Sequence, residues 1–137
     1  MVVVDGKGIP LGGLIASASP AEVTLLEATL ATIQVPRNGP GRPRSKPTRV
    51  IADRAYDSDA LRETLAARGA WANVKPMARR KTILAFSSYV YRFRNLVERF
   101  FNKLKHFRAL ATRYDKNPLN FLAAIKFVAA RISINTL

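Results

Sequence analysis

Two acidic residues in different surroundings are the best candidates for chemistry in this chain. Asp53 directly follows Thr48–Ala52, a short apolar run that predicts a buried strand. Glu98 is the only acid in Tyr91–Lys105, a segment with five basic residues. Carboxylate oxygens are preferred ligands of Mg²⁺ and Mn²⁺, so any metal bound by this chain is expected to be a hard ion with oxygen ligands. The chain has no cysteine and a single histidine, His106, so a thiolate or histidine-rich metal site is excluded.

The segment around Glu98 is typical of an amphipathic helix. At about 100° per residue, Tyr91, Arg94, Glu98 and Lys105 fall within an arc of roughly 60°. The opposite side is apolar and predicts a core-facing surface: Phe93, Leu96, Val97, Phe100, Leu104 and Phe107. Periodicity alone favours an ordinary surface helix with an i,i+4 ion pair between Arg94 and Glu98. Such a pair is worth only about a few tenths of a kcal/mol.

The spacing of the four polar residues is more specific than the helical periodicity. It reads Y-(2)-R-(3)-E-(6)-K, and residues 91–108 and 111–116 resemble the helix of the insertion-sequence DDE transposases that carry this signature. The block Ile51–Ser58 resembles the family's strand-end segment that holds its second catalytic aspartate. Residues Val3–Leu11 are similar to the hairpin before the family's first helix. The resemblance therefore extends over nearly the whole chain.

The resemblance implies roles for particular residues. Asp53 matches the second catalytic aspartate and Glu98 the catalytic glutamate, so both are expected to bind metal, two Mg²⁺ or Mn²⁺ ions in the complete site. The implied reactions are metal-dependent phosphodiester cleavage at transposon ends and strand transfer into target DNA. Tyr91, Arg94 and Lys105 are expected to hold phosphates of the cleaved strand and to orient the glutamate. Further sequence-independent phosphate contacts are expected from Arg42, Arg44, Arg79, Arg80 and Lys103.

Hydrophobic patterning and turn residues predict one α/β domain over residues 1–137. The predicted elements are a β-hairpin at 1–16, helices at 19–34, 57–67, 88–110 and 117–137, strands at 48–53 and 70–74, and basic loops at 36–47 and 76–85. The resemblance implies a ribonuclease H-like mixed sheet flanked by helices, of which the first, central strand is missing. In the family that strand carries the first catalytic aspartate.

The charge of the chain predicts a nucleic-acid partner. The formal net charge is +14, and residues 35–137 hold 22 of the 23 basic residues but only six of the nine acids. A large positive field on a folded domain suits a polyphosphate such as DNA. The alternatives are a charge that serves solubility and a contact with an anionic membrane surface. No apolar run has the roughly 20 residues of a membrane span, so we expect a cytoplasmic, nucleoid-associated protein without a membrane partner.

The site predicted in this way lacks one of its three acids. Asp5 lies in Asp-Gly-Lys-Gly, which is typical of a turn, so we interpret it as a turn residue and not as the first catalytic aspartate. We expect the missing acid to come from an upstream transposase segment and the isolated chain to be inactive, and we expect this segment or a homo-oligomer as a partner. The chain would then be the second frame of a frameshifted transposase or a truncated relic.

Other polar and aromatic residues have simpler interpretations. Asp57 or Ser58 is expected to cap the helix at 57–67, and Asp59 is also interpreted as a capping residue. His106 is expected to lie at a surface or helix end, and Trp71 in the core or on a strand face, with stacking on a base as the alternative. Two other functions stay open. One is a non-catalytic basic nucleic-acid-binding module, which assigns no role to a lone glutamate on a basic helix. The other is a regulator that associates with a full-length transposase.

Overall fold

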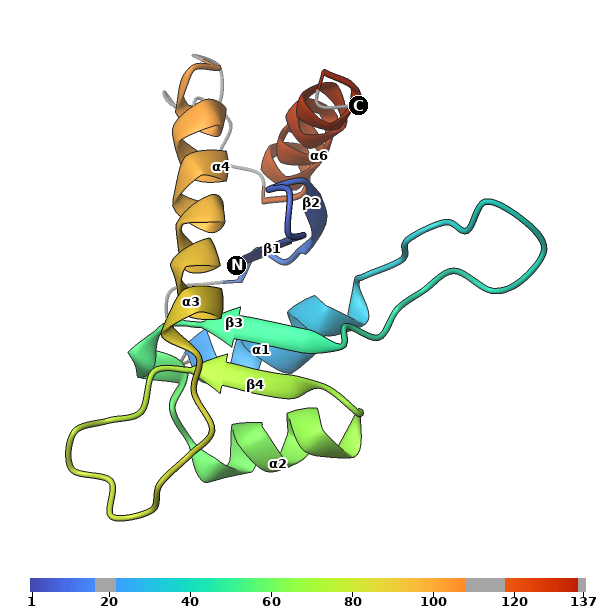
Figure 1. Ribbon diagram of the computed structural model, residues 1–137. Coiled ribbons are helices and arrows are strands. Elements are labelled where there is room, and N and C mark those ends of the chain that lie inside the picture. The colour runs from blue at the N-terminus through green and yellow to red at the C-terminus, as the bar shows by residue number, and fades with distance from the viewer. Residues whose placement is uncertain (17–21, 108–117, 136–137) are drawn as a thin grey trace.

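The computed structural model describes residues 1–16, 22–107 and 118–135, in which short strands alternate with helices (Figure 1). In chain order the elements are β1 (Val2–Val4), β2 (Pro10–Gly13), α1 (Glu22–Ala31), β3 (Arg49–Ala52), the 3₁₀ turn η1 (Arg54–Tyr56), α2 (Asp59–Ala67), β4 (Trp71–Val74), α3 (Ser88–Tyr91), the 3₁₀ turn η2 (Arg92–Arg94), α4 (Asn95–Lys105) and α6 (Pro118–Ile134). The predicted α/β class is therefore present.

The N-terminal hairpin is fixed by its turn. One carboxylate oxygen of Asp5, Oδ1, accepts hydrogen bonds from the backbone N–H groups of Lys7 and Ile9, each at 2.8 Å. Gly8 has a φ of 82°, a conformation that a residue with a side chain rarely adopts. The interpretation of Asp5 as a turn residue is thereby confirmed, since its side chain is occupied by its own turn.

The strands form two separate sheets. β1 and β2 pair antiparallel, from Val2 opposite Gly13 to Val4 opposite Pro10. β3 and β4 pair parallel in an unbroken register, and α2 connects them. Within the described residues β1 pairs only with β2 and β3 only with β4, so each of these two strands keeps one edge without a strand neighbour. Within the described residues the two sheets are not joined, which is compatible with the expected mixed sheet that lacks its central strand.

Helices cover both faces of these sheets. Val3 of β1 and Val50 of β3 share a core with Leu26 and Leu30 of α1, so α1 lies against both sheets on the same side. Helix α2 contributes Leu65 to this core. The alternation of side chains along β1 turns its other residues toward a second core, which consists of Phe100, Leu104, Val128 and Ile132 from α4 and α6, with Val2 and Val4 packed against it.

The helix predicted over residues 88–110 is divided into three parts. α3 and α4 are separated by the tighter turn η2, although Tyr91, Arg92 and Arg94 all keep right-handed helical dihedrals. Residues 108–110 lie outside the described part. Phe93 was predicted to face the core, yet it is 43% exposed and packs edge-on against Tyr89. Phe93 is exposed because, among the described elements, α6 packs against the helix only nearer its C-terminal end, where Phe100 and Leu104 lie.

Other element boundaries differ modestly from expectation. α1 ends at Ala31 and not at residue 34, and the predicted start of this helix, at residue 19, lies outside the described residues. The loop at 36–47 is closed at its base by an isolated bridge between Val35 and Arg44. None of the described helices has the length and apolar character needed to cross a membrane.

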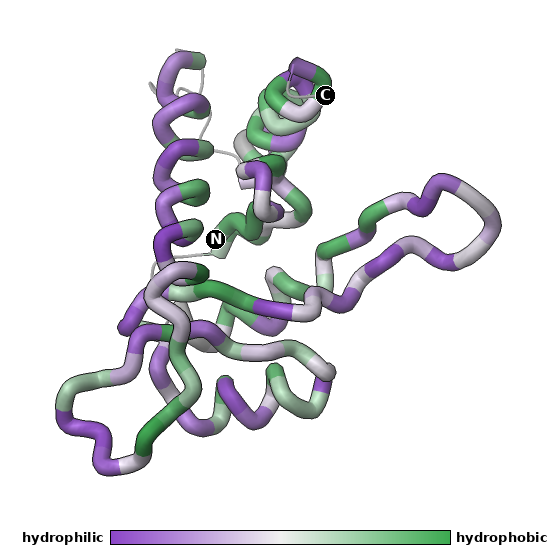
Figure 2. The backbone as a smooth tube through the Cα atoms, viewed as in Figure 1, coloured by the Kyte–Doolittle hydropathy of each residue, from purple (hydrophilic) through white to green (hydrophobic). Residues whose placement is uncertain are grey.

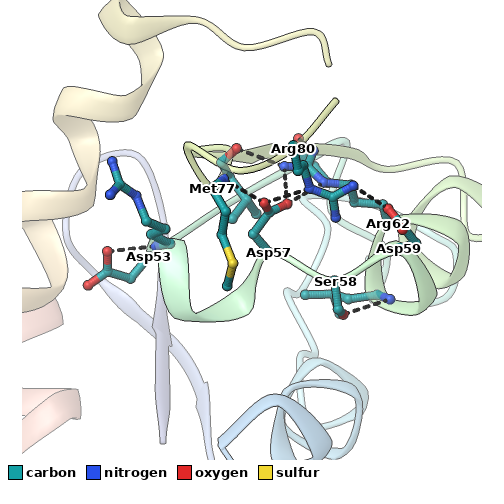
Figure 3. Close-up of polar contacts among 11 residues, drawn as sticks. Asp53, Asp57, Ser58, Asp59, Arg62, Met77 and Arg80 are labelled. Atoms are coloured by element: carbon teal, nitrogen blue, oxygen red, sulfur yellow. Dashed lines mark hydrogen bonds and ion pairs between the residues drawn. The ribbon is translucent and has the colours of Figure 1, made fainter. Parts of the chain in front are cut away.

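A buried carboxylate ties together the loops beyond the strands (Figure 3). The side chain of Asp57 is 0% exposed and accepts hydrogen bonds from Arg62, from Arg80 and from the backbone N–H of Met77. Arg62 also donates to the carbonyl oxygen of Val74, at the end of β4. The start of α2, the end of β4 and the following loop are thus joined at one group.

Of the two residues predicted to cap α2, Ser58 is the one that does so, and this network gives Asp57 a different role. The side chain that caps α2 is Ser58, whose Oγ accepts the N–H of Leu61. Burial alone would raise the pKa of Asp57, but the hydrogen bonds from Arg80, Met77 and Arg62 outweigh it and lower the pKa from 3.8 to about 2. The carboxylate is therefore charged in the folded protein at any pH above this value.

Replacing Asp57 by asparagine should lower the free energy of unfolding by about 3 kcal/mol at neutral pH, because two arginines lose their buried partner. The native carboxylate has a depressed pKa, so it contributes stability above pH 4 that is lost as the pH falls from about 4 to about 2. Urea unfolding at pH 7, 4 and 2.5 measures both effects. Asp59→Asn, at a mostly exposed partner of Arg80, is the matched control and should cost less than about 1 kcal/mol. Equal losses in the two variants would contradict this account.

Candidate active site at the end of strand β3

Asp53 lies at the point where the chain leaves the sheet. It follows the last residue of β3 and caps η1, with its Oδ1 accepting the N–H of Arg54 at 2.7 Å. Its backbone is extended, and its side chain is 55% exposed. A short buried strand followed by a tight turn thus fixes the main chain of Asp53 while its carboxylate reaches solvent.

The helix that carries Glu98 is anchored to the neighbouring strand. The buried side-chain amide of Asn73, in β4, donates to the carbonyl oxygen of Ser87 at 3.0 Å and accepts the N–H of Ser87 at 2.9 Å. Ser87 is also the N-cap of α3, and its Oγ accepts the N–H of Val90. Because β4 runs parallel to β3, this contact places the start of the helix beside the strand that ends at Asp53.

Arg94 joins the two acids that the sequence singled out. Its Nη1 lies 3.4 Å from Oδ2 of Asp53, and its Nη2 lies 3.0 Å from Oε1 of Glu98. Asp53 and Glu98 are 45 residues apart in the sequence, so folding alone brings them to the same guanidinium. Both carboxylates keep exposed surface, and Glu98 is 59% exposed. The pair is therefore open to a ligand from solvent.

Tyr91 completes this cluster. Its hydroxyl donates to Oδ1 of Asp53 at 3.3 Å, and Arg94 lies over its ring, with the guanidinium carbon 5.9 Å from the ring centre. Burial and the negative charge of Asp53 raise the pKa of Tyr91, against the opposing effect of Arg94. Tyr91, Arg94, Asp53 and Glu98 are hereafter called the Arg94 cluster.

The donor chemistry of the cluster fits a hard divalent cation. Two carboxylates supply oxygen ligands of the type that Mg²⁺ and Mn²⁺ prefer. Together they carry one negative charge more than Arg94 neutralises. No group of three or more metal-binding acidic, histidine or cysteine side chains occurs among the described residues, so the cluster offers two protein carboxylates and no more from that part of the chain.

The remaining predicted site residues lie outside the cluster. Lys103 and Lys105 are exposed on the last turn of α4, and Lys105 is two turns from Glu98, or about 10 Å along the axis. Arg42 and Arg44 are exposed in the loop between α1 and β3, and Arg79 is exposed after β4. Arg80, a further predicted phosphate contact, donates hydrogen bonds to Asp57 and Asp59, and its contact with phosphate stays a prediction.

Two residues that hold the site in place were missed from sequence. Asn73 is a polar residue inside an apolar strand, and Asp57 follows Asp53 by four residues in a turn. A polar side chain predicted to be buried must find hydrogen-bond partners, so Asn73 carried a usable signal. Its partner Ser87, 14 residues away, could not be read from local sequence.

Comparison with known proteins finds that this chain is similar to transposases. The profile of the transposase DDE domain matches residues 50–135. Over 137 residues the chain is 34% identical to a protein assigned as the transposase of insertion sequence element IS402 from Burkholderia cepacia, covering 99% of this chain and 62% of that protein. Over 84 residues it is 37% identical to one assigned to element IS6501 from Brucella ovis, covering 61% of this chain and 65% of that protein. No solved structure matches significantly.

The charges around Tyr91 give a direct test of the cluster in solution. Asp53→Asn should lower the pKa of Tyr91, because it removes a neighbouring negative charge, and Arg94→Gln should raise it. NMR titration of ¹³Cζ-labelled tyrosine measures both shifts. Asp59→Asn serves as the control and should leave the pKa of Tyr91 unchanged. Shifts of the same sign in Asp53→Asn and Arg94→Gln would contradict the described geometry.

Proposed function

The chain belongs to the transposase DDE domain family of insertion sequences, and from this membership we propose that it acts in DNA transposition by metal-dependent cleavage and strand transfer at transposon ends. It spans 62% and 65% of the two relatives it matches, so the activity belongs to the complete transposase, of which this chain supplies part of the site.

The observation that carries this proposal is the shared contact of Asp53 and Glu98 with Arg94. A structural ion pair on a helix needs only one carboxylate. Here a second carboxylate, from the end of a strand, reaches the same guanidinium, and both remain exposed. We expect this arrangement of two metal ligands that contact the Arg94 guanidinium until metal ions take its place.

Each residue of the Arg94 cluster has a proposed task. Asp53 and Glu98 would hold the metal ions, Mg²⁺ or Mn²⁺. Such ions activate an attacking oxygen and stabilise the leaving oxygen at a phosphodiester. Tyr91 orients Asp53 through its hydroxyl, and Arg94 is placed to contact a phosphate oxygen once its carboxylate partners bind metal.

We propose that a strand from another segment completes the site. In the part of the chain that the structure describes, β1 and β3 each keep one unpaired edge, and α1 packs against both sheets. A strand inserted between them would join the two sheets into a single mixed sheet, as in a ribonuclease H-like fold. An acid on this strand would lie next to Asp53 and supply the third carboxylate. Its source is an upstream transposase segment.

DNA would lie along the basic side of α4. Exposed basic residues follow the helix from the cluster to its end: Arg92, Arg99, Lys103 and Lys105. Lys105 belongs to the Y-(2)-R-(3)-E-(6)-K spacing, and its distance from Glu98 favours a contact with a phosphate beyond the reacting one. On this spacing we place the chain in the transposase group that carries the signature. Arg79 and Arg80 remain proposed phosphate contacts, and Arg80 also donates to Asp57 and Asp59.

Metal binding can be measured on the chain as it is. Mn²⁺ titration should broaden the amide NMR signals around Asp53 and Glu98 first, because a paramagnetic ion relaxes nearby nuclei. Asp53→Asn and Glu98→Gln should each weaken Mn²⁺ binding at least about tenfold, since each removes a carboxylate ligand. Both variants should keep their affinity for duplex DNA.

Asp59→Asn is the matched control, because it removes an exposed carboxylate outside the cluster. Unchanged Mn²⁺ binding in both site variants, with duplex affinity retained, would favour the non-catalytic nucleic-acid-binding module. Metal-dependent nicking of a transposon end by the chain alone would contradict the proposed need for a completing strand. Nicking that appears only when the upstream segment is added would support it.

A further inference from the structure

A slender, strongly basic segment extends away from the body of the protein between α1 and β3 (Figure 1). It comprises residues 36–47 and is called the basic arm. Its base is closed by two hydrogen bonds, from Val35 N to Arg44 O at 2.9 Å and from Arg44 N to Val35 O at 2.8 Å. All its residues except Pro47 are exposed. The arm is therefore a defined projection with its side chains in solvent.

The arm carries positive charge without compensation. It holds four basic residues, and no acid occurs anywhere between Glu27 and Asp53. Within the described part of the chain, none of the four forms an ion pair, whereas Arg62, Arg80 and Arg94 all do. Figure 2 shows hydrophilic segments along both sides of the projection. The uncompensated residues are Arg37, Arg42, Arg44 and Lys46.

The arm is thin because few of its residues carry bulky side chains. Six of its twelve residues are glycine or proline, and it contains no aromatic or β-branched side chain. Gly39 and Gly41 have φ values of 145° and 135°, where any side chain would strain the backbone. Arg42 stands between Gly41 and Pro43, so it is a long cationic side chain flanked by small or flat neighbours. The residues on both sides of Arg42 therefore add little steric bulk beside its side chain.

These properties match one groove of DNA. The minor groove of B-form DNA is only about 6 Å wide, and it excludes helices and bulky strands. It is narrowest in A/T-rich sequences, where its enhanced negative potential attracts inserted arginines. The wide major groove would leave a thin arm poorly packed. The wide, shallow minor groove of double-stranded RNA would do the same.

We propose that the basic arm binds the minor groove of A/T-rich duplex DNA, with Arg42 inserted and the other basic residues on the flanking phosphates. The arm leaves the N-terminal end of β3, and Asp53 follows the C-terminal end of the same strand. The groove contact therefore lies away from the Arg94 cluster, on duplex that flanks the reacting phosphate. The proposal rests on the proposed function only in taking DNA as the partner.

Duplexes that contain a base analogue distinguish recognition in the minor groove from recognition in the major groove. Inosine lacks the minor-groove amino group of guanine, so an I·C duplex resembles A·T in the minor groove and G·C in the major groove. Fluorescence anisotropy of the full chain, with EDTA present, should show A/T-rich and I·C duplexes bound about tenfold more tightly than G/C-rich duplex. Double-stranded RNA should bind no better than the G/C-rich DNA. Netropsin, which occupies A/T-rich minor grooves, should displace the protein.

Matched arginine variants test the arm itself. Arg42→Ala should abolish the preference for A/T-rich over G/C-rich duplex. Arg79→Ala, at an exposed arginine after β4, should weaken binding to all duplexes equally and keep the preference. Equal affinity for all duplexes, an I·C duplex that behaves as G/C, or a preference that survives Arg42→Ala would overturn the proposal. Because EDTA removes divalent ions, these outcomes are independent of metal binding at Asp53 and Glu98.

Discussion

One guanidinium that neutralises two carboxylates from distant parts of the chain is the interaction on which the site depends. Asp53 comes from the end of a strand and Glu98 from a helix, and like charges so placed would repel without the cation between them. Arg94 therefore sets the spacing of the acids in this structure. The same contact holds Arg94 between the two carboxylates that are proposed to bind metal ions.

The site itself is exposed and polar, so its geometry must be imposed by buried groups behind it. Asn73 fixes the start of the helix segment to β4, and Asp57 fixes the end of β4 to α2 and the loop after it. Both residues are buried with every side-chain polar atom partnered. Moving either partner away from such a group would leave an uncompensated polar or charged atom in the interior. Because this is costly, the contacts keep the arrangement rigid.

Sequence reasoning succeeded where local pattern decides the outcome. The strand before Asp53, the turn at Asp5 and the polar face with Tyr91, Arg94 and Glu98 all follow from short-range periodicity and turn chemistry. It failed where tertiary contacts decide. The exposure of Phe93 depends on where α6 packs against the helix, and the buried role of Asp57 depends on Arg62, Met77 and Arg80, up to 23 residues later in the chain.

The central claim is that Asp53 and Glu98 bind the same metal site once Arg94 is displaced. A crystal structure of the full chain grown with Mn²⁺ and recorded at the manganese edge tests it directly. The account predicts an anomalous peak within ligand distance, about 2.0–2.6 Å, of both carboxylates, with the Arg94 guanidinium moved off them. Manganese bound elsewhere, or Arg94 still joining both acids at saturating Mn²⁺, would contradict it.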